Sequence, residues 1–216
     1  MALTDKILYK ILIIPGILLG LTVHEYAHAY VADRLGDKTP KFQGRLTFNP
    51  FAHIDVIGFI MILLIGFGWA KPVETNPSAL KRGYKDAIKV SIAGILANLI
   101  TAFAFALIIG GLYKHDLIIL RDVTSLKGII GIILSYTVSI NCMLAVFNIM
   151  PIPGLDGFNI LRDLAPKTFY KVSNVMYNYQ LIILLIFVVT PIANYLVGIP
   201  SNLLSYLFMK ISMSIF

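Results

Sequence analysis

The sequence is poor in charged residues and in cysteine, and each shortage excludes a class of protein. Only 13% of the 216 residues are charged, whereas 58% are hydrophobic. Soluble domains carry about 25% charged residues, and a water-soluble domain cannot bury this much apolar surface, so lipid must be part of the solvent. The single cysteine, Cys142, excludes an intramolecular disulfide and a cysteine-rich zinc module. Any metal must therefore be held by histidine and carboxylate side chains.

Polar stretches long enough to fold separately are also lacking, so we expect one membrane-embedded domain over residues 1–216, with a core at 7–165 and further membrane segments at 172–216. The formal net charge is +7. The basic residues lie in short loops between apolar runs, where we expect them to set topology and to contact the lipid bilayer rather than nucleic acid. The sequence does not indicate an oligomeric state.

The long apolar runs predict an all-α polytopic membrane protein with five to six membrane segments. We interpret the run 7–32 as a retained transmembrane helix rather than a signal peptide, because it lacks a small-residue cleavage site. Full-length spans follow at 87–112 and 128–150, and another runs from about 172 to 190. The last run, 192–216, is expected to form either a kinked helix or an interfacial one.

Two segments after the first span differ from these runs. Segment 33–55 is basic and contains glycine and proline, and its partial alternation predicts at most a small β-hairpin near 40–50. Segment 56–69 is apolar but has only 14 residues. That length suits a short re-entrant segment better than a full crossing.

The strongest chemical signal is His24-Glu25-Tyr26-Ala27-His28, near the end of the first apolar run. Histidines at i and i+4 lie on the same helix face and can reach one metal ion. Glu25 projects nearby and can take a proton from water and return it to a leaving amine. Ionisable residues at the end of a membrane span are costly unless they are paired or bind metal. We therefore interpret the motif as a zinc site.

A third protein ligand is needed, since catalytic zinc keeps three protein ligands and one open position. The candidates are His53, His115 and the carboxylates near span ends. Asp156 stands out because it follows an apolar span within a turn rich in proline and glycine, although an ordinary Asp-Gly turn also accounts for it. His28 and Asp156 reach the same side of the membrane only if segment 56–69 enters the bilayer and returns.

The distribution of basic residues agrees with that topology. Loops 33–55, 70–89 and 157–171 share the side of the metal motif and carry twelve lysines and arginines. The opposite side carries five: Lys6, Lys10, Lys114, Arg121 and Lys127. The positive-inside rule therefore predicts a multi-pass protein of the cell membrane with its active site toward the cytoplasm.

Several stretches together resemble the site-2 protease family of intramembrane zinc metalloproteases, in its compact bacterial and archaeal branch without a PDZ or CBS domain. The resemblance covers roughly residues 15–165. The stretches are His24-Glu25-Tyr26-Ala27-His28, residues 93–98, residues 148–153 followed by Leu155-Asp156-Gly157, residues 44–50 with His53-Ile54-Asp55, and residues 68–73.

This resemblance implies one zinc ion per chain, with His24, His28 and Asp156 as ligands and Glu25 as general base and acid. It implies a zinc metalloendopeptidase that hydrolyses transmembrane protein substrates after local unwinding, in regulated intramembrane proteolysis. Related sequences often carry proline at the position of Gly154, so the resemblance does not fix the shape of the active-site turn.

Three further residues have a functional and a structural interpretation. The resemblance implies that Asn98 and Asn148 bind the substrate backbone or the oxyanion, where an amide donor stabilises developing negative charge. Interhelical hydrogen bonding accounts for both asparagines as well. His53 is a candidate for binding the substrate or a water molecule at the metal, and the alternative is a histidine that stabilises a loop.

Two other functions compete with proteolysis. One is a non-proteolytic membrane protein that binds substrate helices and uses zinc structurally, but a purely structural site has no use for the base Glu25. The other is a metal transporter, which needs a polar route through the membrane. Spans 87–112 and 128–150 contain too few ionisable residues for such a route.

Overall fold

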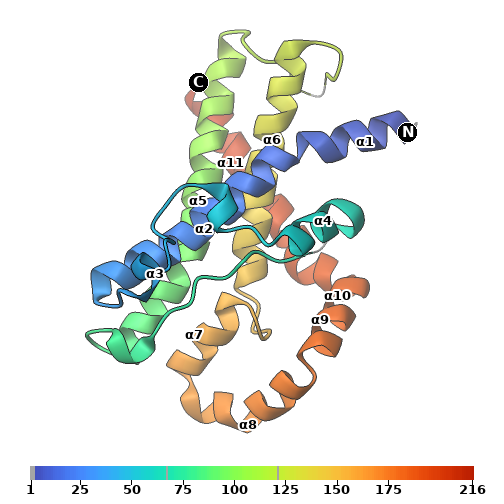
Figure 1. Cartoon of the computed structure of the whole chain (residues 1–216). Coiled ribbons are helices and arrows are strands. Elements are labelled where there is room, and N and C mark those ends of the chain that lie inside the picture. Colours follow the sequence, from blue (N-terminus) through green and yellow to red (C-terminus); the bar gives the residue numbers. More distant parts are fainter. Residues whose placement is uncertain (1–2, 67, 121) are drawn as a thin grey trace.

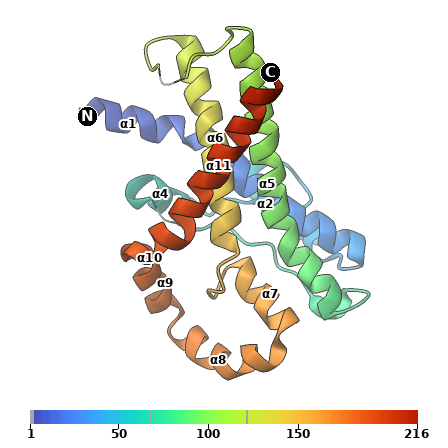
Figure 2. The same ribbon diagram turned by 180° about the vertical axis from the view of Figure 1, so that it is seen from behind.

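The computed structural model describes residues 3–66, 68–120 and 122–216, and these residues form helices and loops without a β-sheet. Two long antiparallel helices, α5 (Tyr84–Lys114) and α6 (Leu126–Asn148), stand side by side, and α2 (Ile14–Leu35) crosses them (Figure 1). On the opposite side, α11 (Ile199–Ile215) lies across α5 and α6 (Figure 2). The predicted all-α architecture is therefore confirmed.

Four helical stretches among the described residues are long and apolar enough to cross a membrane, and a bent helix pair could make a fifth. The stretches are Ile7–Leu35, Tyr84–Lys114, Leu126–Asn148 and Pro191–Ile215. The first contains the end of α1 (Leu3–Leu12) and all of α2, whose first turn holds a proline and whose last residue is followed by Gly36 at φ +118°. The chain is thus a multi-pass membrane protein. Arg121, one of the five basic residues counted above, lies outside the described residues.

The stretch expected as a span at 172–190 is a bent helix pair, which forms either one broken span or a re-entrant loop. Its residues divide between α8 (Pro166–Asn178) and α9 (Gln180–Val189), and the two helices meet at an angle of 84°. The uninterrupted apolar run of α9 is too short to cross about 30 Å of hydrocarbon, whereas α8 presents a polar face with exposed lysines. Beyond Thr190 come α10 (Pro191–Ala193), a π-helical turn (Asn194–Gly198) and α11, which together form the single helical stretch Pro191–Ile215.

The small β-hairpin expected near 40–50 is also absent from the described residues. A short helix, α3 (Thr39–Phe42), and a 3-10 turn, η1 (Pro50–Ala52), occupy this stretch instead. The buried Asp37 carboxylate accepts a hydrogen bond from the Thr39 amide at the start of α3, at 2.9 Å. The Arg45 side chain donates to the carbonyls of Ala52 and Lys71, which lie outside the stretch 40–50.

Segment 56–69 leaves the helix bundle and returns to its starting point. Its ordered helix is α4 (Val56–Ile65), too short to span a bilayer. Ile54 and Ala70 form an antiparallel bridge, and the Lys71 amide donates to the His53 carbonyl at 2.9 Å. The two ends of the segment therefore lie side by side, as the re-entrant interpretation requires. The next turn, η2 (Pro77–Ala79), leads into α5.

Close packing of α5, α6 and α11 forms the centre of the bundle. The fully buried side chains there include Ala102, Ala106, Val138 and Cys142. Small residues let the helix backbones approach, and the Ser212 hydroxyl of α11 donates to the Ala106 carbonyl of α5 at 2.6 Å. The position and orientation of α5, which carries part of the candidate site, depend on these contacts.

Two adjacent glycines of α5 give a test of this packing. A Cβ at Gly110 would lie 2.2 Å from the Ser212 hydroxyl and 3.1 Å from its carbonyl, whereas one at Gly111 would meet only the Phe216 ring at 3.7 Å. We expect Gly110→Ala to lower the free energy of unfolding by about 1–3 kcal/mol through overpacking. Gly111→Ala should be neutral or stabilising, because alanine favours the helix. Unfolding by SDS titration measures both, and equal stabilities would contradict this packing.

Candidate metal centre

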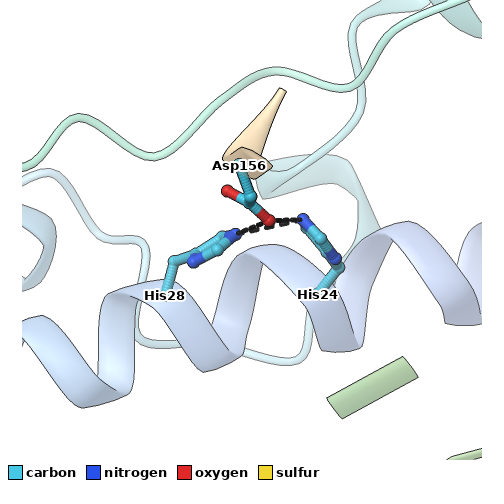
Figure 3. A group of neighbouring side chains, drawn as sticks. All are labelled: His24, His28 and Asp156. Carbon is cyan, nitrogen blue, oxygen red and sulfur yellow. Dashed lines mark hydrogen bonds and ion pairs between the residues drawn. The ribbon is translucent and has the colours of Figure 1, made fainter. Parts of the chain in front are cut away.

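One face of α2 presents the histidine motif to the inside of the bundle. His24, Glu25 and His28 are 6%, 8% and 8% exposed, so the motif is buried although it is strongly polar. The i to i+4 spacing stacks the two imidazoles on one face of the helix. Figure 3 shows both rings rising from α2 toward the carboxylate of Asp156 above them. The helix alone therefore accounts for two of the three converging groups.

Asp156 reaches the motif because α7 (Asp156–Leu164) begins at this residue, directly after the turn that follows α6. The turn needs two glycines. Gly154 adopts φ +95°, which proline cannot adopt, so the turn of this chain differs from one with proline there. A Cβ at Gly157 would lie 2.0 Å from the Ile149 carbonyl, so this residue must also be small. The Asp156 side chain is 12% exposed and its Oδ2 points at both histidines.

Three potential ligand atoms converge at this point. His24 Nε2 and His28 Nε2 lie 3.2 and 3.3 Å from Asp156 Oδ2, and 3.0 Å from each other. Zinc with Zn–N of about 2.0–2.1 Å and tetrahedral angles would separate its ligand atoms by about 3.3 Å. The three spacings fit that value closely. His24, His28 and Asp156 therefore form a group that could hold a metal ion, and no other such group occurs among the described residues.

The hydrogen bonds of the two rings favour a cation between them. His28 Nδ1 donates to the Val90 carbonyl at 2.7 Å, and His24 Nδ1 donates to Asn98 Oδ1 at 2.7 Å. In neutral imidazoles with Nδ1 protonated, each Nε2 presents a lone pair. Asp156 Oδ2 is buried and has no hydrogen-bond partner among the described residues. Three electron-rich atoms in mutual contact repel one another unless a cation lies between them, so these residues fit zinc.

Burial alone would raise the pKa of the Asp156 carboxyl group, whereas His28 and His24 in their protonated form lower that pKa below its ordinary value. A metal cation held between the three side chains would act on Asp156 in the same direction. A carboxylate ligand must be deprotonated to bind metal, so the surroundings of Asp156 favour the form that binds.

The extended segment 70–76, which we call the strap, passes over the motif and contacts Glu25. The Val73 amide donates to Glu25 Oε2 at 2.9 Å. Oε1 of the same carboxylate has no hydrogen-bond partner among the described residues. The strap therefore fixes one oxygen of Glu25 and leaves the other available.

Two buried charges that the sequence analysis did not single out hold the strap in place. Arg45, only 7% exposed, donates to the carbonyls of Lys71 and Pro72 at 3.3 Å each. Asp37 is fully buried and accepts from the Asn76 amide at 2.6 Å. Because these partners are 26 to 39 residues away in the sequence, local pattern does not reveal them. The sequence offered one indication that Arg45 matters: it lies within the stretch 44–50, which is part of the family resemblance.

The three further candidates lie in different surroundings. Asn98 is fully buried, accepts from His24 and donates to the Gly20 carbonyl and Asn141 Oδ1 at 3.0 and 2.9 Å. These contacts orient the His24 ring and link three helices, as the interpretation of Asn98 as an interhelical hydrogen-bonding residue expects. Asn148 donates to the Leu144 carbonyl of its own helix at 2.9 Å. Substrate binding by either asparagine stays a prediction.

His53 lies below the strap rather than at an open surface. It is fully buried, and its Nε2 donates to the Thr47 carbonyl at 2.8 Å. Its Nδ1 has no partner among the described residues. The contact with Thr47 corresponds to the loop-stabilising alternative, and a role of His53 in binding substrate stays a prediction.

Comparison with known proteins agrees with this geometry. The profile of peptidase family M50 matches residues 12–191. The chain is 37% identical over 198 residues to "Putative zinc metalloprotease YwhC" of Bacillus subtilis (strain 168), with 88% of each chain covered. It is 28% identical over 190 residues to "Putative zinc metalloprotease Rip2" of Mycolicibacterium smegmatis, covering 85% of this chain and 69% of the relative. No solved structure matches the chain.

The family match includes α2 with its histidine motif, the strap and the start of α7, which are the elements that meet at the centre. Zinc is the cofactor that these relatives name and that the converging side chains fit. The chain therefore belongs to peptidase family M50 and is a multi-pass membrane zinc metalloprotease.

Proposed function

We propose that this protease hydrolyses peptide bonds of transmembrane protein substrates within the bilayer, in regulated intramembrane proteolysis. The observation that carries the proposal is the position of the motif: His24, Glu25 and His28 are buried on a helix that is long and apolar enough to span a membrane. A substrate bond must therefore come to the depth of α2. We also propose that the centre opens toward the cytoplasm and that residues 1–216 act as one domain of the cell membrane.

We assign the zinc ligands as His24 Nε2, His28 Nε2 and Asp156 Oδ2. A zinc ion held by these residues would supply Lewis-acid chemistry: it would lower the pKa of a bound water to about 7 and would polarise the carbonyl of the peptide bond. Asn98 and the Val90 carbonyl keep the two rings in the orientation and tautomer that present Nε2. The chain thus contributes three ligands and leaves one position for water or substrate.

Glu25 is the residue that moves the proton. Glu25 is not one of the assigned ligands. It lies between the two histidines in the sequence, and its Oε1 is free to accept a hydrogen bond. As water attacks the carbonyl carbon, Glu25 accepts one of its protons. The proton then passes to the nitrogen as the C–N bond breaks, giving an amine and a carboxylic acid that contains the oxygen of the water. The hydrogen bond from Val73 keeps the Glu25 carboxylate aimed at this point.

The strap has a second role in this proposal. The strap lies over the face of α2 that carries the motif, and Arg45 and Asp37 hold it there. In this position it limits the entry of bulk water to Glu25. A substrate segment must be extended to present its peptide bond, since the amides of a helix are already hydrogen-bonded. The substrate therefore has to unwind locally before it reaches Glu25.

Replacing the base separates catalysis from metal binding. We expect Glu25→Gln to keep zinc, because all three assigned ligands remain, and to lower cleavage of a synthetic transmembrane substrate by at least about 100-fold. Zinc content of the purified protein and cleavage in liposomes measure the two effects. Asp156→Ala is the comparison variant and should lose both zinc and activity. Normal cleavage by Glu25→Gln would contradict the assigned mechanism.

A single methyl group beneath the histidines should disturb the centre. A Cβ at Gly94 would lie 2.4 Å from His28 Nε2 and 2.7 Å from His24 Cε1. We expect Gly94→Ala to displace both rings and to weaken zinc binding by about 10- to 100-fold, the usual range for disturbed ligand orientation. Competition with a zinc chelator measures the affinity. Gly111→Ala, at the other end of α5, is the matched control, and equal affinities in the two variants would refute the geometry.

The orientation can be tested with one cysteine at each end of α5. Ser78 and His115 are exposed, and α5 between them has 31 residues, a length of about 46 Å. The native Cys142 is buried and should not react. We expect an impermeant maleimide to label Ser78→Cys only in inverted vesicles and His115→Cys only in right-side-out vesicles. The reverse pattern would contradict a cytoplasmic active site.

A further inference from the structure

A small polar hollow lies beside the metal centre and has no part in the mechanism described above. Its volume is about 150 Å³. It is lined by the strap and η2, by the first turns of α5 and by α7, with the residues Thr75, Pro77, Ala87, Val90, Ser91, Asn159 and Arg162. We call it the Ser91 pocket.

Three of its walls continue directly from groups that form the centre. The Val90 carbonyl accepts the hydrogen bond from His28 Nδ1. Thr75 follows Val73, whose amide contacts Glu25, by two residues of extended chain, about 7 Å. Asn159 lies one turn after Asp156 on the same face of α7, where Cβ atoms are about 5–6 Å apart. The pocket therefore shares its walls with the elements that position His28, Glu25 and Asp156.

The lining offers hydrogen-bonding groups that the protein itself does not use. Ser91 is 7% exposed, Asn159 is half-buried and Thr75 is exposed. The hydroxyls of Ser91 and Thr75 and the amide nitrogen of Asn159 make no hydrogen bond to the protein among the described residues, whereas Asn159 Oδ1 accepts from Arg162 at 3.4 Å. A ligand that donates and accepts hydrogen bonds would find partners in these groups.

The pocket has almost no net charge. Arg162 is the charged residue that lines it, and its guanidinium pairs with the Asp163 carboxylate at 2.7 and 3.1 Å. The Asp163 side chain is completely covered, so its charge stays next to Arg162. A charged ligand would meet no uncompensated opposite charge and would lose its hydration. An apolar ligand would leave the hydroxyls and the amide unpaired.

We propose that the Ser91 pocket is a subsite for a neutral polar side chain of the substrate, such as serine, threonine or asparagine, at a residue flanking the cleaved bond. The proposal rests on the proposed function. A cavity of about 150 Å³ holds a group the size of benzene, which is comparable to the side chain of asparagine or threonine. In this assignment Ser91 and Asn159 determine specificity, and they are not catalytic residues.

The test begins with a set of synthetic transmembrane substrates cleaved by the wild-type protein in liposomes with zinc. The cleaved bond is located by mass spectrometry, and each of the three residues on either side of it is changed in turn to asparagine, serine, leucine, aspartate or lysine. We expect one position at which asparagine and serine raise kcat/KM about tenfold over leucine, as one net hydrogen bond allows. Aspartate and lysine at that position should be no better than leucine.

The second arm changes the pocket. Asn159→Leu and Ser91→Val should remove or reverse the preference at that one position, so that the leucine substrate is cleaved at least as fast as the asparagine substrate. Most of the change should appear in KM. Asn174→Leu, on the exposed surface of α8, is the matched control and should keep the wild-type order. Zinc content of each variant shows that the metal centre is intact.

The outcomes separate this proposal from the one on which it rests. Cleavage that depends on Glu25 but shows no polar preference at any position, or a preference that both pocket variants retain, overturns the subsite and leaves the protease proposal standing. A preference for aspartate overturns the neutral class. An equal loss of cleavage for all substrates in Asn159→Leu, with zinc retained, shows a structural role and also overturns the subsite. No cleavage by the wild-type protein would overturn both proposals.

Discussion

The contact between His24 Nε2, His28 Nε2 and Asp156 Oδ2 is the constraint on which the rest of the structure depends. Three electron-rich atoms, 3.0 to 3.3 Å apart in a buried place, repel one another unless a cation lies among them. The ligands come from α2 and α7, which are separated by 120 residues in the sequence. The fold brings the two helices together at one depth. Bound zinc would relieve the repulsion, so metal binding would also stabilise the contact between α2 and α7.

The surroundings of the centre show how a buried polar site is held in an apolar bundle. Each ligand ring is fixed by a hydrogen bond on its other nitrogen, to Asn98 or to the Val90 carbonyl. The base Glu25 is fixed by the strap, and the strap is fixed by Arg45 and Asp37. Burying the charges of Arg45 and Asp37 costs free energy, but each of these two side chains is hydrogen-bonded to at least two backbone groups. The chain thus builds a buried polar layer at the end of the bundle where α2 and α7 meet.

Much of this could be predicted from the sequence, because the signals are local. The i to i+4 histidines place themselves on one helix face, long apolar runs fix α5 and α6, and the shortness of segment 56–69 indicates its return. The choice of Asp156 needed topology as well, since an Asp-Gly turn alone has an ordinary explanation. The family resemblance added Asn98 and Asn148, and His53 was a separate hypothesis; the contacts do not test a substrate role for any of the three.

Two segments differ from what the sequence pattern predicted. The stretch 40–50 forms α3 and part of η1 instead of a hairpin, and its Arg45 side chain donates to carbonyls of the distant strap. The stretch 172–190 is bent by 84° between α8 and α9, a break that the length of the apolar run does not reveal. The most direct test of the central claim is zinc X-ray absorption spectroscopy of the purified protein in lipid. The account predicts two imidazole nitrogens and at least one oxygen at about 2.0–2.2 Å, with one histidine's signal lost in His24→Ala. A coordination shell unchanged in that variant, or one containing the sulfur of Cys142, would contradict it.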